Sequence, residues 1–337
     1  MKMLRPAIGR PARYRWCSPA PFPLLAVFLF FLSSPAIAQS TILRVGHFPN
    51  ITHVQALVAH HLTRQGKGWF EARLGPEVKI EWYVYNAGPS AIEAFFAKSI
   101  DLTYVGPNPA LNGYVKSRGE EVRIVAGAAE GGSALVVQKD SALSAPADFR
   151  GKKIATPQLG NTQDVAARAW LTAGGLRITL TGGDAQVIPA ANPDQLLLFK
   201  QKLVDAVWTV EPWVSRLEME ADGKVLVEDS SAITTVLAVR ADVLGTQREL
   251  VQKFVAAHLE LTDWIKNNPE EAQRIAREEL LAETRTEMPE DLVARAWKRI
   301  VLTGEVSPDK LAALVAGAQS VGFLRDAPDL ARLIEKP

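Results

Sequence analysis

The chain has 337 residues, of which 47% are hydrophobic and 22% are charged. This length allows two domains of ordinary size, and the two fractions are typical of folded globular proteins. The composition therefore excludes a disordered chain and a collagen-like fibre.

The first 38 residues are typical of a secretory signal peptide. Five basic residues precede an apolar run, Leu24 to Leu32, that is too short to cross a bilayer, and Ala36 and Ala38 supply the small residues that signal peptidase needs. We therefore predict cleavage after Ala38 and export to the periplasm. A signal anchor is the alternative interpretation, because the basic part is long.

Removal of this segment changes the charge and the cysteine content. The chain has 38 Lys and Arg, and loss of the five basic residues leaves 33 against 37 Asp and Glu, a net charge of −4. A mildly acidic protein is not expected to bind nucleic acid. The only cysteine, Cys17, lies in the same segment, so disulfides, thiolate catalysis, a lipid-anchor cysteine and Cys-based metal sites are excluded from the mature chain.

Short β-type runs alternate with helix-type runs from Ile42 to Val137. Ile92, Phe95 and Phe96, for example, recur at helical spacing. We predict strand 42–48, helix 52–64, strand 78–86, helix 89–99, strand 100–106, helix 109–119 and strand 122–129. Such alternation predicts a parallel α/β sheet.

A second α/β unit begins near residue 152. Its clearest helix starts at Asn192, which can cap the helix, and has Pro193 in the first turn, where a missing N–H costs nothing. We predict strand 152–157, helix 161–173, strand 185–190, helix 192–202, strand 204–210 and helix 211–220.

The remaining chain is predicted to be one strand followed by a helical tail. The strand is 234–244, and the helical stretches are 248–268, 269–283 and 289–302. The economical arrangement is two lobes, with residues 39–137 and 234–337 in the first and 138–233 in the second. The chain crosses between them near 131–139 and 234–240, and two crossings form a hinge.

Five predicted strand ends lead into helix starts through loops without Lys or Arg. Ligands of open parallel sheets bind at such strand ends, and helix starts offer unpaired N–H donors with partial positive charge. Turn formation alone explains any one loop, but the five together indicate a small anionic ligand held between the lobes. The loops are 46–55, 86–90, 106–112, 160–164 and 211–215.

Several side chains near these loops have two interpretations. Glu211 either complements the charge of a helix start or pairs with a cationic end of the ligand, such as an amine. Trp208, Trp213, Phe48 and Tyr104 are core residues or contact an organic part of the ligand, with Trp213 ranked first for contact.

Histidines raise the question of a metal site. His53 and His60 lie on one helical face, and His47 and His61 are near them. Because no carboxylate or thiol stands at ligand spacing beside them, we predict no metal and no cofactor. His53 is instead expected to donate a hydrogen bond to a ligand oxygen.

Enzyme signatures are missing from the sequence. Ser133 lacks the spacing of a nucleophile elbow, and the segment GLRITLTGGD is not a phosphate-binding loop. We therefore predict that the protein is not an enzyme.

Residues 42–323 resemble the periplasmic solute-binding proteins of the nitrate, sulfonate and taurine ABC importer family. The segments that carry the resemblance, in the order that the family uses, are LRVGHFPNITHVQALVA, YNAGPSAIEAFFA, DLTYVGPNPALNGY, TPQLGNTQDVAARAWL, ANPDQLLLFKQ and VEPWVSRL. The resemblance implies an α/β, type II periplasmic-binding-protein fold, with two lobes, a two-strand hinge and, here, a C-terminal helical tail.

The same resemblance implies the site and the partners. The implied ligand contacts are Phe48, Asn50, His53, Asn86, Gly106, Asn108, Asn161, Thr162, Gln163, Glu211 and Trp213. The implied partners are a small organic anion and an inner-membrane ABC permease with its cytoplasmic ATPase, and we expect a monomer.

An aliphatic sulfonate or taurine is the favoured ligand. Neutral donors at helix starts suit a tetrahedral oxyanion, and Trp213 and Phe48 suit a short carbon chain. Nitrate, bicarbonate and a thiamine-precursor pyrimidine stay as alternatives, as does a role as a ligand-sensing receptor. The pyrimidine synthases of this superfamily use a cysteine-rich motif that is absent here, which again argues against an enzyme.

Overall fold

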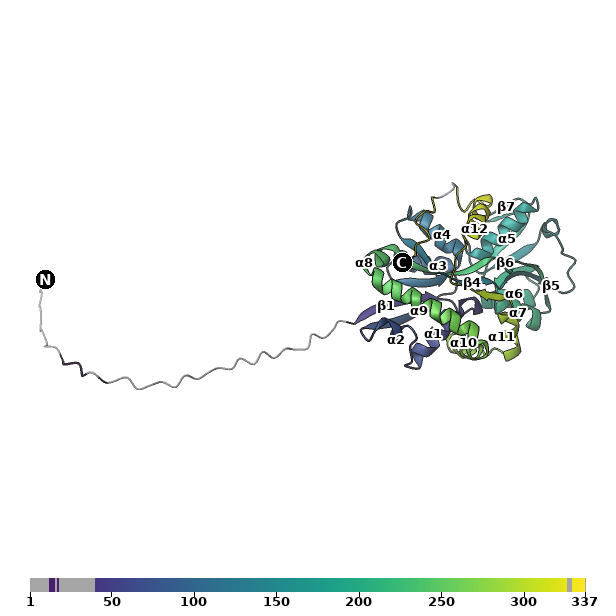
Figure 1. Cartoon of the computed structure of the whole chain (residues 1–337). Coiled ribbons are helices and arrows are strands. Elements are labelled where there is room, and N and C mark those ends of the chain that lie inside the picture. Colours follow the sequence, from purple (N-terminus) through teal and green to yellow (C-terminus); the bar gives the residue numbers. More distant parts are fainter. Residues whose placement is uncertain (1–11, 16, 18–39, 326–328, 337) are drawn as a thin grey trace, which may run out of the picture. The chain divides into compact units, whose positions relative to one another are not determined.

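The computed structural model describes residues 12–15, 17, 40–325 and 329–336, and Gln39–Pro337 form one compact unit (Figure 1). Most of the predicted signal peptide, residues 1–38, lies outside the described residues, so the signal and its cleavage stay predictions. Among the described residues, no helix is long and apolar enough to cross a membrane.

The first lobe is built on a six-stranded sheet of order β13-β4-β12-β3-β1-β2. β1 pairs in parallel with β2 and β3, whereas β12 runs antiparallel to β3 and β4, and β13 runs antiparallel to β4. The sheet is therefore mixed: β1, β2, β3 and β4 run in one direction, as predicted for residues 42–137, and β12 and β13 run in the opposite direction. The strands are β1 (Thr41–His47), β2 (Val78–Val84), β3 (Leu102–Val105), β4 (Val122–Gly131), β12 (Ile233–Arg240) and β13 (Ile300–Leu302).

Helices cover both faces of this sheet. Along β12, Leu237 and Val239 join one apolar core while Val236 and Ala238 join the other, as the alternation of a strand requires. The helices are η1 (Ile51–His53), α1 (Val54–Arg64), α2 (Glu71–Leu74), α3 (Gly88–Phe96), α4 (Pro107–Lys116), α8 (Ala241–Thr246), α9 (Arg248–Asn267), α10 (Pro269–Thr284), α11 (Glu290–Trp297) and α12 (Pro308–Ser320).

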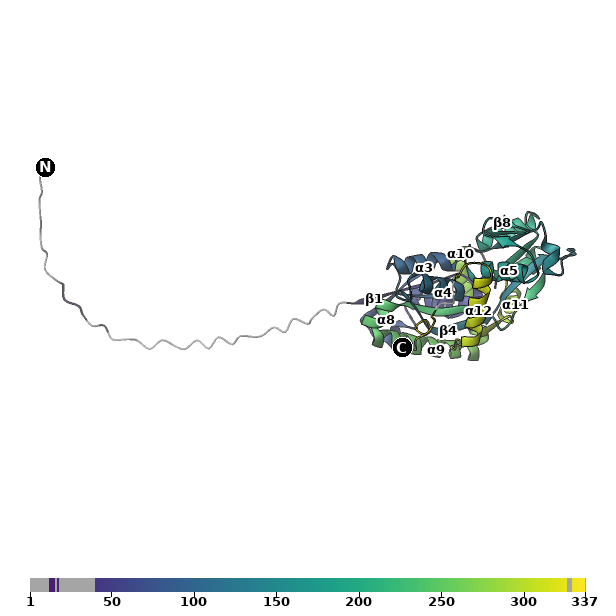
Figure 2. The ribbon, with the colours of Figure 1, turned by 90° about the horizontal axis from the view of Figure 1, so that it is seen from above.

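The second lobe is built on a five-stranded sheet of order β11-β5-β10-β6-β9. β6 pairs in parallel with β9 and β10, and β5 runs antiparallel to β10 and β11. Its elements are β5 (Ser133–Gln138), η2 (Pro146–Phe149), β6 (Lys153–Thr156), α5 (Thr162–Ala173), β7 (Ile178–Thr179), β8 (Gly182–Gly183), β9 (Gln186–Pro189), α6 (Asn192–Lys200), β10 (Ala206–Val210), α7 (Trp213–Glu220) and β11 (Gly223–Glu228). Figure 2 shows α5 and β8 at one end of the unit and α8 at the other.

The chain passes between the sheets twice. It leaves the first sheet at Gly131 and enters the second at Ser133, and it returns between Glu228 and Ile233. Gly131 has a φ of 69°, and a Cβ there would stand 2.4 Å from the carbonyl oxygen of Arg299, so only glycine fits the first crossing without a shift. The predicted lobe boundaries stay a prediction, because residues 39–337 form one unit.

The C-terminal region differs from the predicted helical tail in two places. The helix expected at 289–302 ends at Trp297, and Ile300–Leu302 become β13 at the edge of the first sheet. Their N–H and C=O groups pair with β4, an interaction that the local sequence pattern does not indicate. α12, which was not predicted, packs against α4 of the first lobe and α5 of the second.

Candidate functional site

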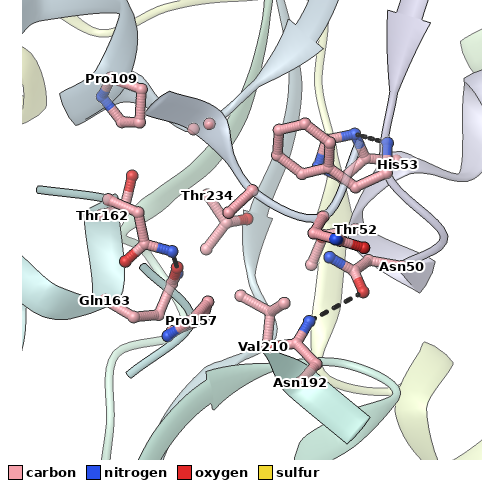
Figure 3. A pocket seen from close by; sticks show the side chains of 16 residues that line it. Asn50, Thr52, His53, Pro109, Pro157, Thr162, Gln163, Asn192, Val210 and Thr234 are labelled. Carbon is pink, nitrogen blue, oxygen red and sulfur yellow. Dashed lines mark hydrogen bonds between the residues drawn. The ribbon is translucent and has the colours of Figure 1, made fainter. Parts of the chain in front are cut away.

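A small cavity lies between the two lobes (Figure 3). The volume that the centre of a water-sized sphere can occupy in this cavity is about 20 Å³. On this measure, one water molecule needs roughly 10–15 Å³. The lining residues are Phe48, Asn50, Thr52, His53, Asn86, Ala87, Gly88, Gly106, Pro109, Pro157, Asn161, Thr162, Gln163, Asn192, Val210 and Thr234. No Lys, Arg, Asp or Glu is among these described residues.

Five helix starts reach the cavity. Gly88 and Asn192 are the first residues of α3 and α6, and Gly106 and Asn161 are the N-caps of α4 and α5. Asn50 is the N-cap of η1, which continues into α1. Helix starts carry unpaired N–H groups and roughly half a positive charge. The cavity is therefore electropositive without containing a cation.

Asn50 is held in one orientation by the second lobe. Its Oδ1 accepts hydrogen bonds from Trp213 Nε1 at 3.1 Å and from Asn192 Nδ2 at 3.5 Å. With the oxygen used in this way, the side chain offers its Nδ2 group as a donor. The Ile51 N–H also donates to the Glu211 carbonyl at 3.0 Å, so the loop that carries Asn50 is joined to the second lobe.

His53 is a neutral donor. Its ring packs on Phe48 with centroids 4.4 Å apart, and its Nδ1 faces the Phe48 N–H at 3.4 Å. Burial lowers the pKa of His53 well below its usual value, and nearby His47 lowers it further. The acceptor role of Nδ1 leaves the proton on Nε2. The predicted hydrogen bond from His53 to a ligand stays a prediction.

The start of α5 is held in place by hydrogen bonds of its N-cap residue and of its first turn. Asn161 Oδ1 accepts from the Asp164 N–H at 2.9 Å, and Asp164 in turn accepts from the Gly160 N–H at 2.9 Å and from Arg168 Nε at 3.1 Å. Thr162 Oγ1 accepts from the Asn108 N–H at 3.4 Å, which leaves its hydroxyl proton available. The donors of this helix start are therefore positioned in advance.

Further contacts join the lobes around the cavity. Ser90 Oγ lies 3.3 Å from Gln158 Oε1, and Asn112 Nδ2 donates to the Gly160 carbonyl at 3.5 Å. Together with the contacts of Asn50, these bonds join the two lobes around the cavity.

The structure brings together eight of the eleven site residues predicted from the sequence. The cavity is lined by Phe48, Asn50, His53, Asn86, Gly106, Asn161, Thr162 and Gln163. Asn108, Glu211 and Trp213 do not line it. Whether any of the eleven binds a ligand stays a prediction.

Glu211 is engaged by the protein itself. Its fully buried carboxylate accepts hydrogen bonds from Ser215 N, Ser215 Oγ and Arg299 Nη1, each at 3.0 Å. Burial raises the pKa of this carboxyl, although the bonds from Ser215 and Arg299 oppose the rise. Since Ser215 is in the first turn of α7, the contacts correspond to the helix-start interpretation of Glu211.

Trp213 and Asn108 stand behind the cavity wall. Trp213 is buried and reaches the site only through Asn50. Asn108 is fully buried, and both polar atoms of its amide lack a hydrogen-bond partner among the described residues.

A second, larger cavity adjoins the first, because both are lined by Thr162 and Thr234. It measures about 570 Å³ on the same measure and lies between α5 and α12. Asn108 lines it, as do the apolar side chains of Val165, Trp208 and Leu314.

Sequence reasoning missed part of the lining. Thr52, Pro109, Pro157, Asn192, Val210 and Thr234 were not among the predicted site residues. Asn192 had a usable signal, because it starts a helix directly after a strand, like the five loops that were chosen. Val210 and Thr234 lie on strands, and local sequence carries no sign of their position.

The histidines divide into two groups. His53 lines the cavity, whereas His47 and His60 meet Glu283 of α10 elsewhere in the first lobe. No carboxylate stands at ligand spacing from these histidines in the sequence, because Glu283 is 223 residues from His60.

Comparison with known proteins places the chain in a family. A family model described as the NMT1-like family matches residues 37–279. A putative binding protein of Brucella abortus (strain 2308) is 25% identical over 259 residues, covering 74% of this chain and 75% of the relative. The putative aliphatic sulfonates-binding protein of Escherichia coli (strain K12) is 27% identical over 206 residues, covering 60% of this chain and 59% of the relative.

Solved structures show the same fold. The alkanesulfonate-binding protein SsuA from Xanthomonas axonopodis pv. citri, bound to MOPS, superposes with a TM-score of 0.69 at 19% identity, covering 89% of this chain and 99% of that chain. This match confirms the predicted type II periplasmic-binding-protein fold, and the relatives, which are binding proteins, confirm that the chain is not an enzyme. Because the family model covers well over half of its residues, the chain belongs to the NMT1-like family.

Proposed function

We propose that this protein is the substrate-binding component of an ABC importer, and that it captures a small organic anion, an aliphatic sulfonate or taurine, between its two lobes. The observation that supports the proposal is the cavity without charged side chains on which five helix starts converge. Such a set of neutral donors recognises a negative oxygen group.

Neutral donors suit a protein that must release its ligand. Each helix start contributes about 0.3–1 kcal/mol toward binding an anion, and more when it is shielded from water. Five starts therefore supply a few kcal/mol, to which the side-chain donors of Asn50 and His53 add. A buried ion pair would be costly to form and costly to break, so a Lys or Arg in the cavity would slow delivery to a permease.

The sizes of the two cavities favour a sulfonate over a larger planar ligand. The space among the helix starts has room for about two waters, so it favours a compact head group such as a sulfonate. The adjoining cavity is also lined by Asp229, Asp309 and Lys310, and its apolar side chains, Val165, Trp208 and Leu314, offer contacts for a carbon chain. A pyrimidine ring would need the small cavity to widen.

Delivery to a permease and a place in the periplasm are part of the proposal. They rest on the family, on the structural similarity to a periplasmic type of binding protein and on the predicted signal peptide, which lies outside the described residues. Growth of a deletion strain on an alkanesulfonate as its only sulfur source tests this part: loss of growth, restored by the gene, is expected.

Calorimetry with a series of ligands tests the choice of ligand. Methanesulfonate, ethanesulfonate, butanesulfonate, taurine, nitrate and a pyrimidine precursor are the probes. If the carbon chain enters the apolar cavity, each added methylene contributes about 0.8 kcal/mol, or about fourfold in affinity. Affinity that does not change with chain length would contradict this placement, and tight binding of nitrate or of the pyrimidine alone would replace the sulfonate.

A pair of tryptophan variants tests how the site is positioned. Trp213→Phe removes the N–H that fixes Asn50 Oδ1, and the loss of one such hydrogen bond costs about 0.5–1.5 kcal/mol, so anion affinity is expected to fall about 2- to 10-fold. Trp69→Phe is the matched control, since it removes an N–H that donates at 2.9 Å to the Ala257 carbonyl in the first-lobe core. Equal affinities of the two variants would show that Asn50 does not need this contact.

A further inference from the structure

Two histidines and two glutamates converge inside the first lobe, away from the ligand cavity. His47 ends β1, His60 lies on α1, and Glu279 and Glu283 are one turn apart on α10. We call these four residues the His–Glu cluster. Their side chains are 0%, 9%, 0% and 1% exposed, respectively, so bulk water does not solvate them.

The polar atoms of the cluster point at one another. His47 Nε2 is 3.0 Å from Glu283 Oε1 and 3.2 Å from His60 Nδ1, and His60 Nδ1 is 2.9 Å from the same Glu283 oxygen. Glu279 Oε1 lies 3.0 Å from His60 Nδ1. Three potential ligand atoms from three separate elements, His47 Nε2, His60 Nδ1 and Glu283 Oε1, thus lie within hydrogen-bond distance of one another. Glu279 Oε1 also accepts from Arg64 Nε at 2.8 Å.

Neutral histidines satisfy this arrangement poorly. Both nitrogens of His47 face oxygens, Nδ1 facing the Phe48 carbonyl at 3.3 Å and Nε2 facing Glu283, but a neutral imidazole has one N–H. Glu279 Oε2 and Glu283 Oε2 are buried and lack a hydrogen-bond partner among the described residues. A cation at the centre would accept the lone pair of His47 Nε2 and the Glu283 carboxylate, while His47 Nδ1–H donates to the carbonyl, as metal-bound histidines do.

The spacing fits a particular ion. A tetrahedral zinc ion at about 2.0–2.1 Å from each ligand holds its ligand atoms roughly 3.3 Å apart, and the three mutual distances among His47, His60 and Glu283 are 3.2, 3.0 and 2.9 Å. Imidazole with carboxylate is a ligand set that zinc accepts, whereas calcium and magnesium prefer oxygen alone.

We propose that His47, His60 and Glu283 bind a zinc(II) ion. Glu279 Oε1, which accepts from Arg64 Nε at 2.8 Å, lies beside His60 outside the set of ligands. Trp82 closes the site on one side, since its ring lies edge-on to His47 and stacks on His60 with centroids 5.5 and 5.4 Å away. An apolar wall of this kind keeps water from competing for the metal.

The ion would connect the C-terminal helices to the ligand cavity. It joins α10 to β1 and α1, and His47 is followed directly by Phe48, which lines the cavity and packs on His53. Zinc therefore holds Phe48, which follows His47 and lines the cavity, in place from outside the cavity. This inference is independent of the ligand, because none of the four cluster residues lines the cavity.

Metal content tests the proposal directly. Protein without a purification tag is stripped with a chelator, dialysed against zinc, manganese or calcium and analysed by mass spectrometry of the elements. We expect about one zinc per chain and little manganese or calcium. Cobalt in place of zinc should give the intense visible absorption of a tetrahedral site, which exposed surface histidines do not produce.

Variants and a stability measurement complete the test. Glu283→Gln and His60→Ala should each weaken zinc binding at least about 100-fold, and Glu278→Gln, which changes a partly exposed carboxylate on the same helix, should leave it unchanged. The melting temperature of the wild-type protein should fall with chelator and recover with zinc. This measurement does not depend on the folding of any variant. A wild-type chain that binds no zinc at micromolar concentration, or a Glu283→Gln chain that binds as well as wild type, would overturn the proposal in favour of protonated histidines.

Discussion

The stability of this protein should depend on pH through His258 of α9. This side chain is fully buried, and its ring accepts from the Tyr104 hydroxyl at 2.9 Å and donates to the Gly127 carbonyl at 2.8 Å. Burial lowers the pKa of His258 from 6.5 to about 4. The folded protein therefore keeps this ring neutral in a pH range where the unfolded chain takes up a proton.

The sign and size of the effect follow from these two pKa values. Full stability is present above pH 6.5 and is lost as pH falls toward 4, because only the unfolded chain gains a proton in that window. At about 1.4 kcal/mol per pKa unit, the free energy of unfolding should decrease by about 2.5 kcal/mol between pH 7.5 and roughly pH 4.5 through His258 alone.

Urea unfolding of wild type and of a His258→Gln variant isolates this contribution. Glutamine keeps a donor and an acceptor but does not titrate, so the variant should start less stable at pH 7.5 and lose less stability on acidification. His53, whose pKa burial also lowers, affects both proteins and cancels in the difference. If the two curves of unfolding free energy against pH run parallel from 7.5 to 4.5, the reasoning about His258 is wrong.

Gly106→Ala should abolish ligand binding without unfolding the protein, because a Cβ there would stand 2.5 Å from Thr162 Oγ1; Gly245→Ala, whose methyl group meets nothing within 4 Å, is the control in calorimetry. Equal affinities would show that closure does not bring Gly106 against Thr162. Arg299→Met should cost about 3–5 kcal/mol in urea unfolding, since Glu211 is then buried and unpaired. Adding Glu211→Gln to that variant should restore more than half of the loss, and no recovery would mean that the unpaired carboxylate is not the cause.

The loops of the candidate site could be predicted because their signals are local. A β-type run, a turn with Gly, Pro or Asn, and a helix-type run stand next to one another in the sequence, and each such junction places N–H groups at a strand end. The loops that contain Asn50, Gly106 and Asn161 were found in this way, the resemblance to the family singled out these residues within them, and the structure brings all three to one cavity.

The roles of the charged and aromatic candidates could not be predicted. Glu211 stands in a junction of the same kind, but its partner Arg299 is 88 residues away and takes its carboxylate out of the cavity wall. Trp213 reaches Asn50 across 163 residues and so positions the donor without lining the cavity. Local sequence gives the chemistry of such side chains but not their neighbours.

The secondary-structure predictions also divide into those that depend on local signals and those that depend on distant partners. The helices that begin at Asn192 and Arg248 were predicted from caps and apolar spacing, which depend on residues three or four positions apart. β13 was missed because the hydrogen bonds that make Ile300–Leu302 a strand come from β4, more than 160 residues earlier. Strand pairing is a property of the partner as much as of the segment.

The sequence by itself determined which backbone groups this protein presents: a series of neutral helix starts at strand ends, with no cation among them. Only the tertiary structure decided where those groups point, which side chains hold them there, and that His47 and His60 meet two glutamates of α10. The physical reason is the separation, along the chain, of the groups that interact. Caps and turns are satisfied within a few residues, whereas the partners of a buried charge, an amide oxygen or an imidazole nitrogen are chosen by packing between segments that are distant in the chain.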